Sequence, residues 1–307
     1  MSFMMYLAGG NKESIEKIIL PKGANRLYSQ LNDRRLGEKL IEYNNTVHPI
    51  NIFVDSGAYS VHTKGKEVDV DEYIEYVNAR QGCFQAIAQV DKIPGEFGKP
   101  KTIQQLTEAP ELSWQNYLYM RERIIDKDCL LPIFHQGEDF KHLVRMLEWT
   151  DENGKHIPYI GISPANDVSN KQKDTWLSVV FKVIKSSSNP NVKTHAFGMT
   201  SFKLLEKYPL YSADSTAWLL RAAYGVIFTP YGEYCVSDVR ANETKHVSHF
   251  SAKQMEVLEQ QLSRYGLTLD QVRNENEARV LNNALFFIEW AQNYEYKGTN
   301  SFQKKLF

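Results

Sequence analysis

Short apolar runs alternate with longer amphipathic stretches along the first three quarters of the chain. Each run has the length and the β-branched or aromatic content of a strand, and the stretches between the runs repeat their apolar residues at helical spacing. The pattern predicts eight strands, at residues 4–8, 50–54, 86–90, 130–134, 157–162, 192–197, 210–212 and 225–228.

The predicted helices between these runs have recognisable ends. Residues 69–82 carry an acid in the first turn and Gly82 after the last one, and residues 175–188 and 201–208 show the same helical spacing. Strands that alternate with helices are typical of an α/β fold with a parallel sheet, although a doubly wound open sheet has the same local pattern. Eight such units favour a (β/α)8 barrel of the TIM type, which is the fold that we predict.

The strand pattern stops after Arg240. Residues 250–266 and 267–292 repeat their apolar side chains at the spacing of amphipathic helices instead. We predict a (β/α)8 catalytic barrel over residues 1–240 and a C-terminal helical extension that caps it over residues 241–307.

Composition narrows the class of protein. The 307 residues are 42% hydrophobic and 24% charged, with a formal net charge of −1. These values are typical of a globular protein and indicate no overall attraction to nucleic acid or membranes. No apolar run approaches the ~20 residues that cross a bilayer, and the N-terminal run is too short for a signal peptide. We expect a cytoplasmic protein with no membrane partner.

Three aspartates, Asp55, Asp91 and Asp214, lie where predicted strands give way to turns. Because active sites of such barrels form at the carboxyl ends of the strands, these carboxylates are expected on one rim. Other polar and glycine residues follow the strands: Gly9, Gly10, Ser56, Gly57, His135, Gln136, Gly137, Gly161, Ser163, Gly198, Ser215 and Thr229. Turn formation alone explains any single one of them, but three acids on one rim favour a site.

Six short blocks occur in the order VDSGAYS, QVD, FHQGED, IGIS, HAFGMT and ADSTAW. In sequence, order and spacing they resemble the tRNA-guanine transglycosylase superfamily, whose members exchange a guanine in nucleic acid for a 7-deazaguanine base. The resemblance covers residues 4–229. The compact chain is most similar to the viral branch that modifies DNA, which would place the protein in the host cytoplasm.

The resemblance implies roles for two of the acids. Asp214 aligns with the nucleophile, which attacks C1′ of the sugar and holds a covalent glycosyl-enzyme intermediate. Asp55 aligns with the second catalytic acid, which moves protons as one base leaves and another enters. A turn-capping aspartate is the competing interpretation of Asp55.

The resemblance also implies a base pocket. Asp91 would accept hydrogen bonds from N1–H and the exocyclic amine of guanine, while Gln136 and the backbone N–H of Gly161 would address O6. Tyr59 and Phe197 would stack on the two faces of the ring, although Phe197 suits barrel packing equally well. Further pocket residues are expected from the same blocks, with two of them near the 7-substituent (Ile162 and Ser163) and three elsewhere in the lining (Ser56, Gly137 and His195). His135 and His195 lie at strand ends, where a hydrogen-bonded barrel histidine is commoner than a proton shuttle.

The chain departs from the tRNA enzymes in two places. Gly57-Ala58-Tyr59-Ser60 stands where they have Gly-Gly, an aromatic residue and Gln. Their zinc site, a Cys-x-Cys-x2-Cys cluster with a later His, has no counterpart, because only Cys235 follows Asp214. Cys83 and Cys129 are also isolated, which disfavours disulfides. We therefore expect no metal or other cofactor, and we favour DNA over tRNA as the substrate.

A nucleic-acid partner requires phosphate contacts, and a guanine within a duplex has to be flipped out or unpaired. Candidate phosphate ligands near the rim are Lys64, Lys66, Lys99, Lys101, Arg240 and Lys245, each of which also suits an ordinary solvated surface. The second substrate would be the free 7-deazaguanine base. The sequence leaves the oligomeric state open.

The sequence leaves three alternatives open. The first is a transglycosylase that acts on tRNA, and the second is a barrel that binds nucleic acid without catalysis. The third is a glycoside hydrolase using Asp55 and Asp214, which requires tryptophans near the rim for sugar stacking. It is disfavoured because only Trp218 of the five tryptophans is close to a predicted strand end.

Overall fold

The computed structural model describes residues 3–10, 12–45, 49–58, 60, 67–94, 99–100 and 102–298. Nine parallel strand segments form one sheet in the order β5-β4-β3-β2-β1-β9-β8-β7-β6. The segments are β1 (Met4–Ala8), β2 (Asn25–Ser29), β3 (Ile52–Asp55), β4 (Ala86–Ala88), β5 (Leu130–Leu131), β6 (Ile133–His135), β7 (Tyr159–Ser163), β8 (Lys193–Ala196) and β9 (Ser212–Ser215).

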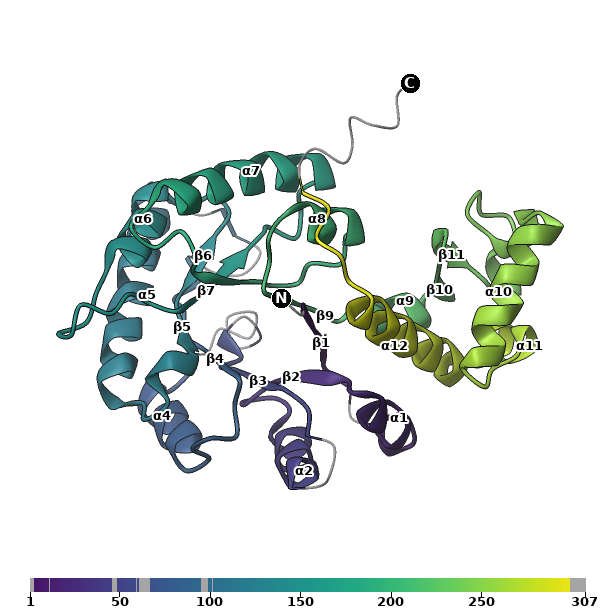
Figure 1. Ribbon diagram of the computed structural model, residues 1–307, viewed down its shortest axis with the longest axis horizontal. Helices are drawn as coiled ribbons and strands as arrows, with labels where there is room; N and C mark the ends of the chain where they lie inside the picture. Colours follow the sequence, from purple (N-terminus) through teal and green to yellow (C-terminus); the bar gives the residue numbers. More distant parts are fainter. Residues whose placement is uncertain are drawn as a thin grey trace.

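The sheet closes on itself through residues 130–135. Pro132 separates β5 from β6 because proline has no N–H for the strand ladder. Its carbonyl still accepts a hydrogen bond from Gly161 N at 2.8 Å, and the carbonyl of Leu131 accepts one from Gln89 N at 3.2 Å. One run of chain therefore pairs with β4 on one side and with β7 on the other. The predicted TIM-type barrel is confirmed (Figure 1).

Residues that alternate along each strand form two separate apolar layers. On β1, Met4, Tyr6 and Ala8 point into the barrel, whereas Met5 and Leu7 pack between the sheet and the helices. The interior layer consists of Met4, Tyr6, Ala8, Leu27, Phe53, Ala86, Ala88, Leu131, Ile133 and Tyr159. This alternation decides which side chains can reach the rim from within the barrel.

Two strand assignments from the sequence differ from the structure. The strand β2 was not predicted, because the charged residue Arg26 interrupts its apolar pattern. Arg26 is completely buried, where it pairs with Glu16 at 2.8 Å and donates to three backbone carbonyls. The prediction of a barrel strand at residues 225–228 was wrong: β10 (Val226–Thr229) pairs antiparallel with β11 (Gly232–Cys235) in a hairpin outside the barrel sheet.

The described helices are α1 (Glu13–Ile19), α2 (Arg34–Asn44), α4 (Val70–Asn78), α5 (Ile103–Arg123), α6 (Phe140–Glu148), α7 (Asn170–Ser186), α8 (Phe202–Lys207), α9 (Ala217–Ala223), α10 (Ala252–Arg264), α11 (Leu269–Asn274) and α12 (Asn276–Gln292). Most of the helices surround the barrel, and α10 and α11 lie to one side of it (Figure 1). Capping boxes that begin at Thr102, Ser169, Ser251 and Thr268 fix the starts of α5, α7, α10 and α11. Among the described residues, no helix combines the length and apolar character needed to cross a membrane.

The helix α12 belongs to the ring around the barrel. It packs against β1, α1 and α9, while α10, α11 and the β10–β11 hairpin extend to one side of it (Figure 1). Phe3, next to β1, contacts the rings of Trp290 and Tyr294 with centroids 5.5 and 4.5 Å away. The last long helix and the first strand are thus packed together.

Buried amides on α12 and α10 connect the hairpin to this helix. Asn283 accepts a hydrogen bond from Phe228 N at 2.9 Å, and its Nδ2 donates to Val226 O at 3.1 Å. Gln261 Nε2 and Asn282 Nδ2 both donate to Phe228 O, at 2.9 and 3.2 Å. Backbone polar groups of Val226 and Phe228 on β10 are therefore satisfied by side chains from α10 and α12.

Replacement of Asn283 by Leu tests this connection. The change leaves the buried Phe228 N without its partner and removes a donor from the partly buried Val226 O, so we expect the free energy of unfolding to fall by about 2–4 kcal/mol in denaturant titrations. Asn274→Leu removes an exposed amide that bonds only to Asp270 on its own helix, and it should change stability by less than about 0.5 kcal/mol. Equal stability of the two variants would contradict the anchoring role.

Candidate active site

The three predicted aspartates lie together at the carboxyl end of the barrel. Asp55 is the last residue of β3, Asp91 follows β4, and Asp214 lies in β9. Asp214 is in register with Tyr6, which points into the barrel, so its side chain also faces inward. Asp55 stands two residues after the inward-facing Phe53. The charges of Asp91 and Asp214 both raise the pKa of Asp55, as expected for carboxylates that share one rim.

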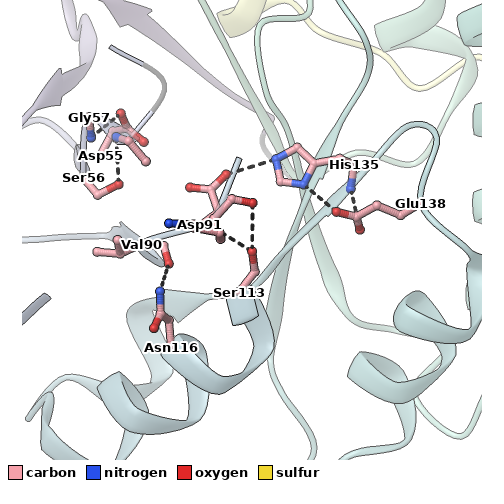
Figure 2. A network of polar contacts seen from close by, with 11 residues as sticks. Asp55, Ser56, Gly57, Val90, Asp91, Ser113, Asn116, His135 and Glu138 are labelled. Carbon is pink, nitrogen blue, oxygen red and sulfur yellow. Dashed lines mark hydrogen bonds and ion pairs between the residues drawn. The ribbon is translucent and has the colours of Figure 1, made fainter. Parts of the chain in front are cut away.

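A tight turn holds Asp55. Gly57 N donates to Asp55 Oδ2 at 3.0 Å, and Ala58 N donates to the hydroxyl of Ser56 at 3.3 Å (Figure 2). Gly57 has a φ of 83°, and a Cβ at this position would lie 2.5 Å from Ser29 Oγ. The turn therefore requires glycine at residue 57, and it fixes one oxygen of the Asp55 carboxyl group.

The pKa of Asp55 is raised to about 7. Burial is the main cause, and the negative charges of Asp91 and Asp214 add to it, while the N–H groups of Ser56 and Gly57 act in the opposite direction. Near neutral pH, Asp55 thus exists in both protonated and charged forms. A carboxyl group in this state is suited to both giving and accepting a proton.

The segment that carries Asp91 is held by α5. Asn116 Nδ2 donates to Val90 O at 2.9 Å, and Lys92 N donates to Ser113 Oγ at 2.8 Å. Figure 2 shows both contacts on either side of Asp91. The backbone around this aspartate is therefore fixed although it lies beyond the end of β4.

A histidine lies between Asp91 and a further acid. His135 Nε2 is 3.0 Å from Asp91 Oδ2, and its Nδ1 is 3.1 Å from Glu138 Oε1 (Figure 2). Burial lowers the pKa of His135, but the hydrogen bonds and charges of Asp91 and Glu138 outweigh it and raise the pKa to about 10. His135 is consequently a cation at neutral pH. Glu138 was not among the predicted site residues, although its position three residues after His135 in one turn was a usable signal.

Asp214 has a polar environment of its own. Gly198 N donates to Asp214 Oδ1 at 2.9 Å, and His195 Nε2 lies 3.1 Å from the same oxygen. Within the described part of the chain, no hydrogen bond reaches Oδ2. Burial lowers the pKa of His195 despite the attraction of Asp214, so the imidazole is neutral. His195 is fully buried and contacts Asp214, and it does not line the open rim in this state.

Phe197 and Gly161 form one packing unit. A Cβ at Gly161 would lie 2.5 Å from Phe197 Cε2 and 2.8 Å from Leu131 Cδ1. The ring of Phe197 also meets Phe53 and His195, with centroids 5.7 and 4.5 Å apart. Glycine at residue 161 thus allows Phe197 to lie across β7 at the top of the barrel interior, where the ring is half-buried.

The remaining predicted pocket residues have different environments. Gln136 Oε1 accepts from Ala165 N at 3.1 Å, and Gln136 N donates to Ser163 O at 2.9 Å. Gly137 is exposed with a φ of 105°, and Ser56 is fully buried. Tyr59 lies outside the described residues.

The prediction for Ile162 requires a correction. Ile162 is fully buried in the apolar layer between the sheet and the helices. Its neighbour Gly161 faces the barrel interior, and successive residues of a strand point to opposite sides. The side chain of Ile162 is therefore on the wrong side of β7 to contact a base at the rim.

A large groove lies beside this rim. It has a volume of about 1110 Å³, and its lining includes Thr200 and Ser201 after β8 together with residues of the hairpin and α10. Arg240 and Lys245, two of the predicted phosphate ligands, line it. Arg240 is paired with Glu243, and two other cations in the lining are also paired with glutamates, namely Arg221 with Glu233 and Arg264 with Glu289. None of the three aspartates lines the groove.

Among the described residues, no group of three or more His, Cys, Asp or Glu side chains is arranged to hold a metal ion. A comparison with protein-family models found no matching family, and a search of curated proteins found no similar sequence.

Replacement of Asp55 by Asn tests the raised pKa. In the folded protein the pKa of Asp55 lies above its ordinary value of 3.8, so the folded protein holds this proton more tightly than the unfolded chain does. Wild-type stability therefore falls as pH rises from about 4 to 7, and Asn removes this loss while its side-chain oxygen can still accept from Gly57. The full rise in pKa corresponds to roughly 4 kcal/mol of stability. Because Asp55 is only half-buried, solvent screening reduces this effect. We therefore expect Asp55→Asn to be more stable than wild type by about 2 kcal/mol at pH 8. Denaturant titrations from pH 4 to 8 measure the difference, and an unchanged difference across this range would refute the raised pKa.

Replacement of Glu138 by Gln tests the charge of His135. Because the folded-state pKa of His135 is raised, its contribution to stability is complete below about 6.5 and is lost as pH rises toward 10. Glu138→Gln removes one of the two charges, so an NMR titration of the ring should give a pKa lower by about one unit or more. Glu111→Gln is the control, because Glu111 faces His142 at 3.6 Å and makes no contact with His135. A His135 pKa that is the same in both variants would exclude the pairing with Glu138.

Proposed function

We propose that the protein is a guanine transglycosylase that exchanges guanine in DNA for a free 7-deazaguanine base, similar to preQ0, through a covalent aspartyl-glycosyl intermediate. The observation that carries this proposal is the contrast between two acids on one rim. Asp214 has one oxygen held by two donors and the other without a hydrogen bond in the described chain, whereas Asp55 has a pKa of about 7. A retaining exchange at a sugar carbon needs one carboxylate as nucleophile and another as acid and base.

In the first step, Asp214 forms a bond to C1′ of the target nucleotide while the bond from C1′ to N9 of guanine breaks. The electron pair of that bond leaves with guanine, and Asp55 supplies the proton that makes the departing base neutral. In the second step, the incoming 7-deazaguanine transfers its N9 proton to Asp55, and N9 attacks C1′. Asp214 is then released as a carboxylate. A pKa of about 7 allows Asp55 to serve in both directions.

Base recognition is assigned to the residues around Asp91. Its carboxylate would accept from N1–H and the exocyclic amine of the purine, with the cationic ring of His135 compensating its charge. Phe197, which directly follows β8, offers a half-buried aromatic ring on which one face of the base would stack. Tyr59, which follows Asp55 by four residues in the sequence, would cover the second face of the base.

Two observations support a polymeric substrate and favour DNA. The groove of about 1110 Å³ is much larger than a single base requires, and its lining includes Thr200, which is close in sequence to Phe197 and Gly198. Arg240 and Lys245 in its lining can contact phosphates. Only Cys235 follows Asp214 in the sequence, so the cysteine cluster of the tRNA enzymes has no counterpart here. The target guanine would be flipped out of the stack to reach Asp214.

Incubation with labelled guanine or a 7-deazaguanine and either DNA or tRNA tests the proposal. We expect label to enter DNA, and Asp55→Asn to slow the exchange by about 10²–10⁴-fold. Exchange into tRNA alone would replace the DNA assignment with the tRNA alternative. Binding of DNA without exchange would indicate a non-catalytic barrel.

The covalent step is tested by trapping. Wild-type protein should form a complex with DNA that survives denaturing electrophoresis, and Asp214→Ala should abolish it because the attacking oxygen is lost. Asp167→Ala, which changes an exposed aspartate in the loop after β7, is the matched control and should trap DNA as wild type does. Wild-type amounts of complex in Asp214→Ala would exclude Asp214 as the nucleophile.

A further inference from the structure

A chain of hydrogen bonds runs through the barrel interior to Asp214. Tyr159 Oη lies 2.5 Å from Ser212 Oγ, Ser212 Oγ lies 2.6 Å from His195 Nδ1, and His195 Nε2 lies 3.1 Å from Asp214 Oδ1. Tyr159 is 3% exposed, and Ser212 and His195 are 0% exposed, so the chain is shielded from bulk solvent. Three neighbouring strands, β7, β8 and β9, supply these side chains.

The surroundings of His195 determine where its proton lies. Aromatic rings of Phe53 and Phe197 face the imidazole, with centroids 4.6 and 4.5 Å away, and Tyr6 lies 6.0 Å from it. In this apolar environment the ring is neutral and has a single N–H. A carboxylate only accepts hydrogen bonds, so the N–H is on Nε2 and points at Asp214.

The other hydrogen positions follow from this one. Nδ1 of His195 has no proton and accepts from the hydroxyl of Ser212. The oxygen of Ser212 then accepts from the hydroxyl of Tyr159. Every donor in this relay points toward Asp214, and Tyr159 and Ser212 fix the tautomer of His195.

We propose that His195, held by Ser212 and Tyr159, is a positioning residue that occupies Oδ1 of Asp214 and thereby makes Oδ2 the attacking atom. The assignment rests on the proposed function in so far as Asp214 is the nucleophile. Gly198 N and His195 Nε2 both bind Oδ1, while Oδ2 has no hydrogen bond within the described residues. Oδ2 thus keeps its lone pairs for C1′, and Oδ1 becomes the carbonyl oxygen of the glycosyl ester.

The same donors act in the reverse direction. When the incoming base displaces Asp214, the electron pair of the bond between Oδ2 and C1′ returns to the carboxylate. Donors already aimed at Oδ1 stabilise that returning charge without rearrangement. The relay therefore affects both the formation and the breakdown of the intermediate.

The hydrogen positions are tested without any substrate. In ¹⁵N NMR spectra of histidine-labelled protein, with the His195 signals identified by their loss in His195→Gln, we expect a protonated Nε2 and an unprotonated Nδ1. In Ser212→Ala, the Nδ1 signal should move because it has lost its donor. Protonation of Nδ1 alone, or of both nitrogens, would overturn the relay.

The effect on the reaction is tested by single-turnover kinetics at saturating nucleic acid and base. His195→Leu removes the donor to Oδ1, so both formation and breakdown of the trapped complex should slow by about 10- to 100-fold, with substrate affinity unchanged. His195→Gln retains an N–H donor and should recover part of the loss. Wild-type rates in a folded His195→Leu protein would overturn the positioning role.

Thr194→Val provides the matched control. Thr194 is on the same strand and 2% exposed, and its hydroxyl makes no hydrogen bond among the described residues. This variant should keep wild-type rates. If wild-type protein itself forms no intermediate, the proposed function fails, and the NMR result still decides whether the relay exists.

Discussion

Closure of the parallel sheet is the constraint on which the rest of the structure depends. The run at residues 130–135 pairs with β4 and with β7, on either side of a proline that cannot donate to either strand. Because all strands in the closed sheet are parallel, their carboxyl ends meet at one rim. Asp55 on β3 and Asp214 on β9 are separated by two strands in the sheet order, and closure brings them to face the same space.

Gathering several acids on a partly buried rim is electrostatically unfavourable, and the structure relieves each acid in a different way. Asp55 keeps a proton up to about pH 7. Asp91 faces the cation of His135, which a second acid, Glu138, also holds. Asp214 has two N–H donors on one oxygen. These three solutions give three acids of the same chemical type different reactivities.

Local patterns in the sequence were sufficient for the barrel and for the position of the acids. Strand length, helical spacing and the turn after each strand are properties of neighbouring residues, and they placed Asp55, Asp91 and Asp214 on the rim. The strand predictions were wrong where contacts between residues far apart in the sequence determine the structure. Residues 225–228 form a hairpin in which amides of α10 and α12 bind backbone groups of β10. The strand β2 contains an arginine whose burial depends on Glu16 and on carbonyls in and just after β1.

The same distinction holds within the site. The pairing of His195 with Ser212 depends on the register between β8 and β9, which no local pattern shows. Ile162 was predicted in the pocket because the sequence does not show which side chains of β7 face the barrel interior. The structure places Gly161 on the interior side, so its neighbour Ile162 faces the helices.

The position of α12 has a consequence for how the barrel folds. Its packing partners include β1, which is far from it in sequence, and Phe3 beside that strand contacts Trp290 and Tyr294. The outer face of β1 stays uncovered until α12 docks on it. Contacts of such long sequence separation form slowly, so we expect this docking to be a late step in the folding of the barrel.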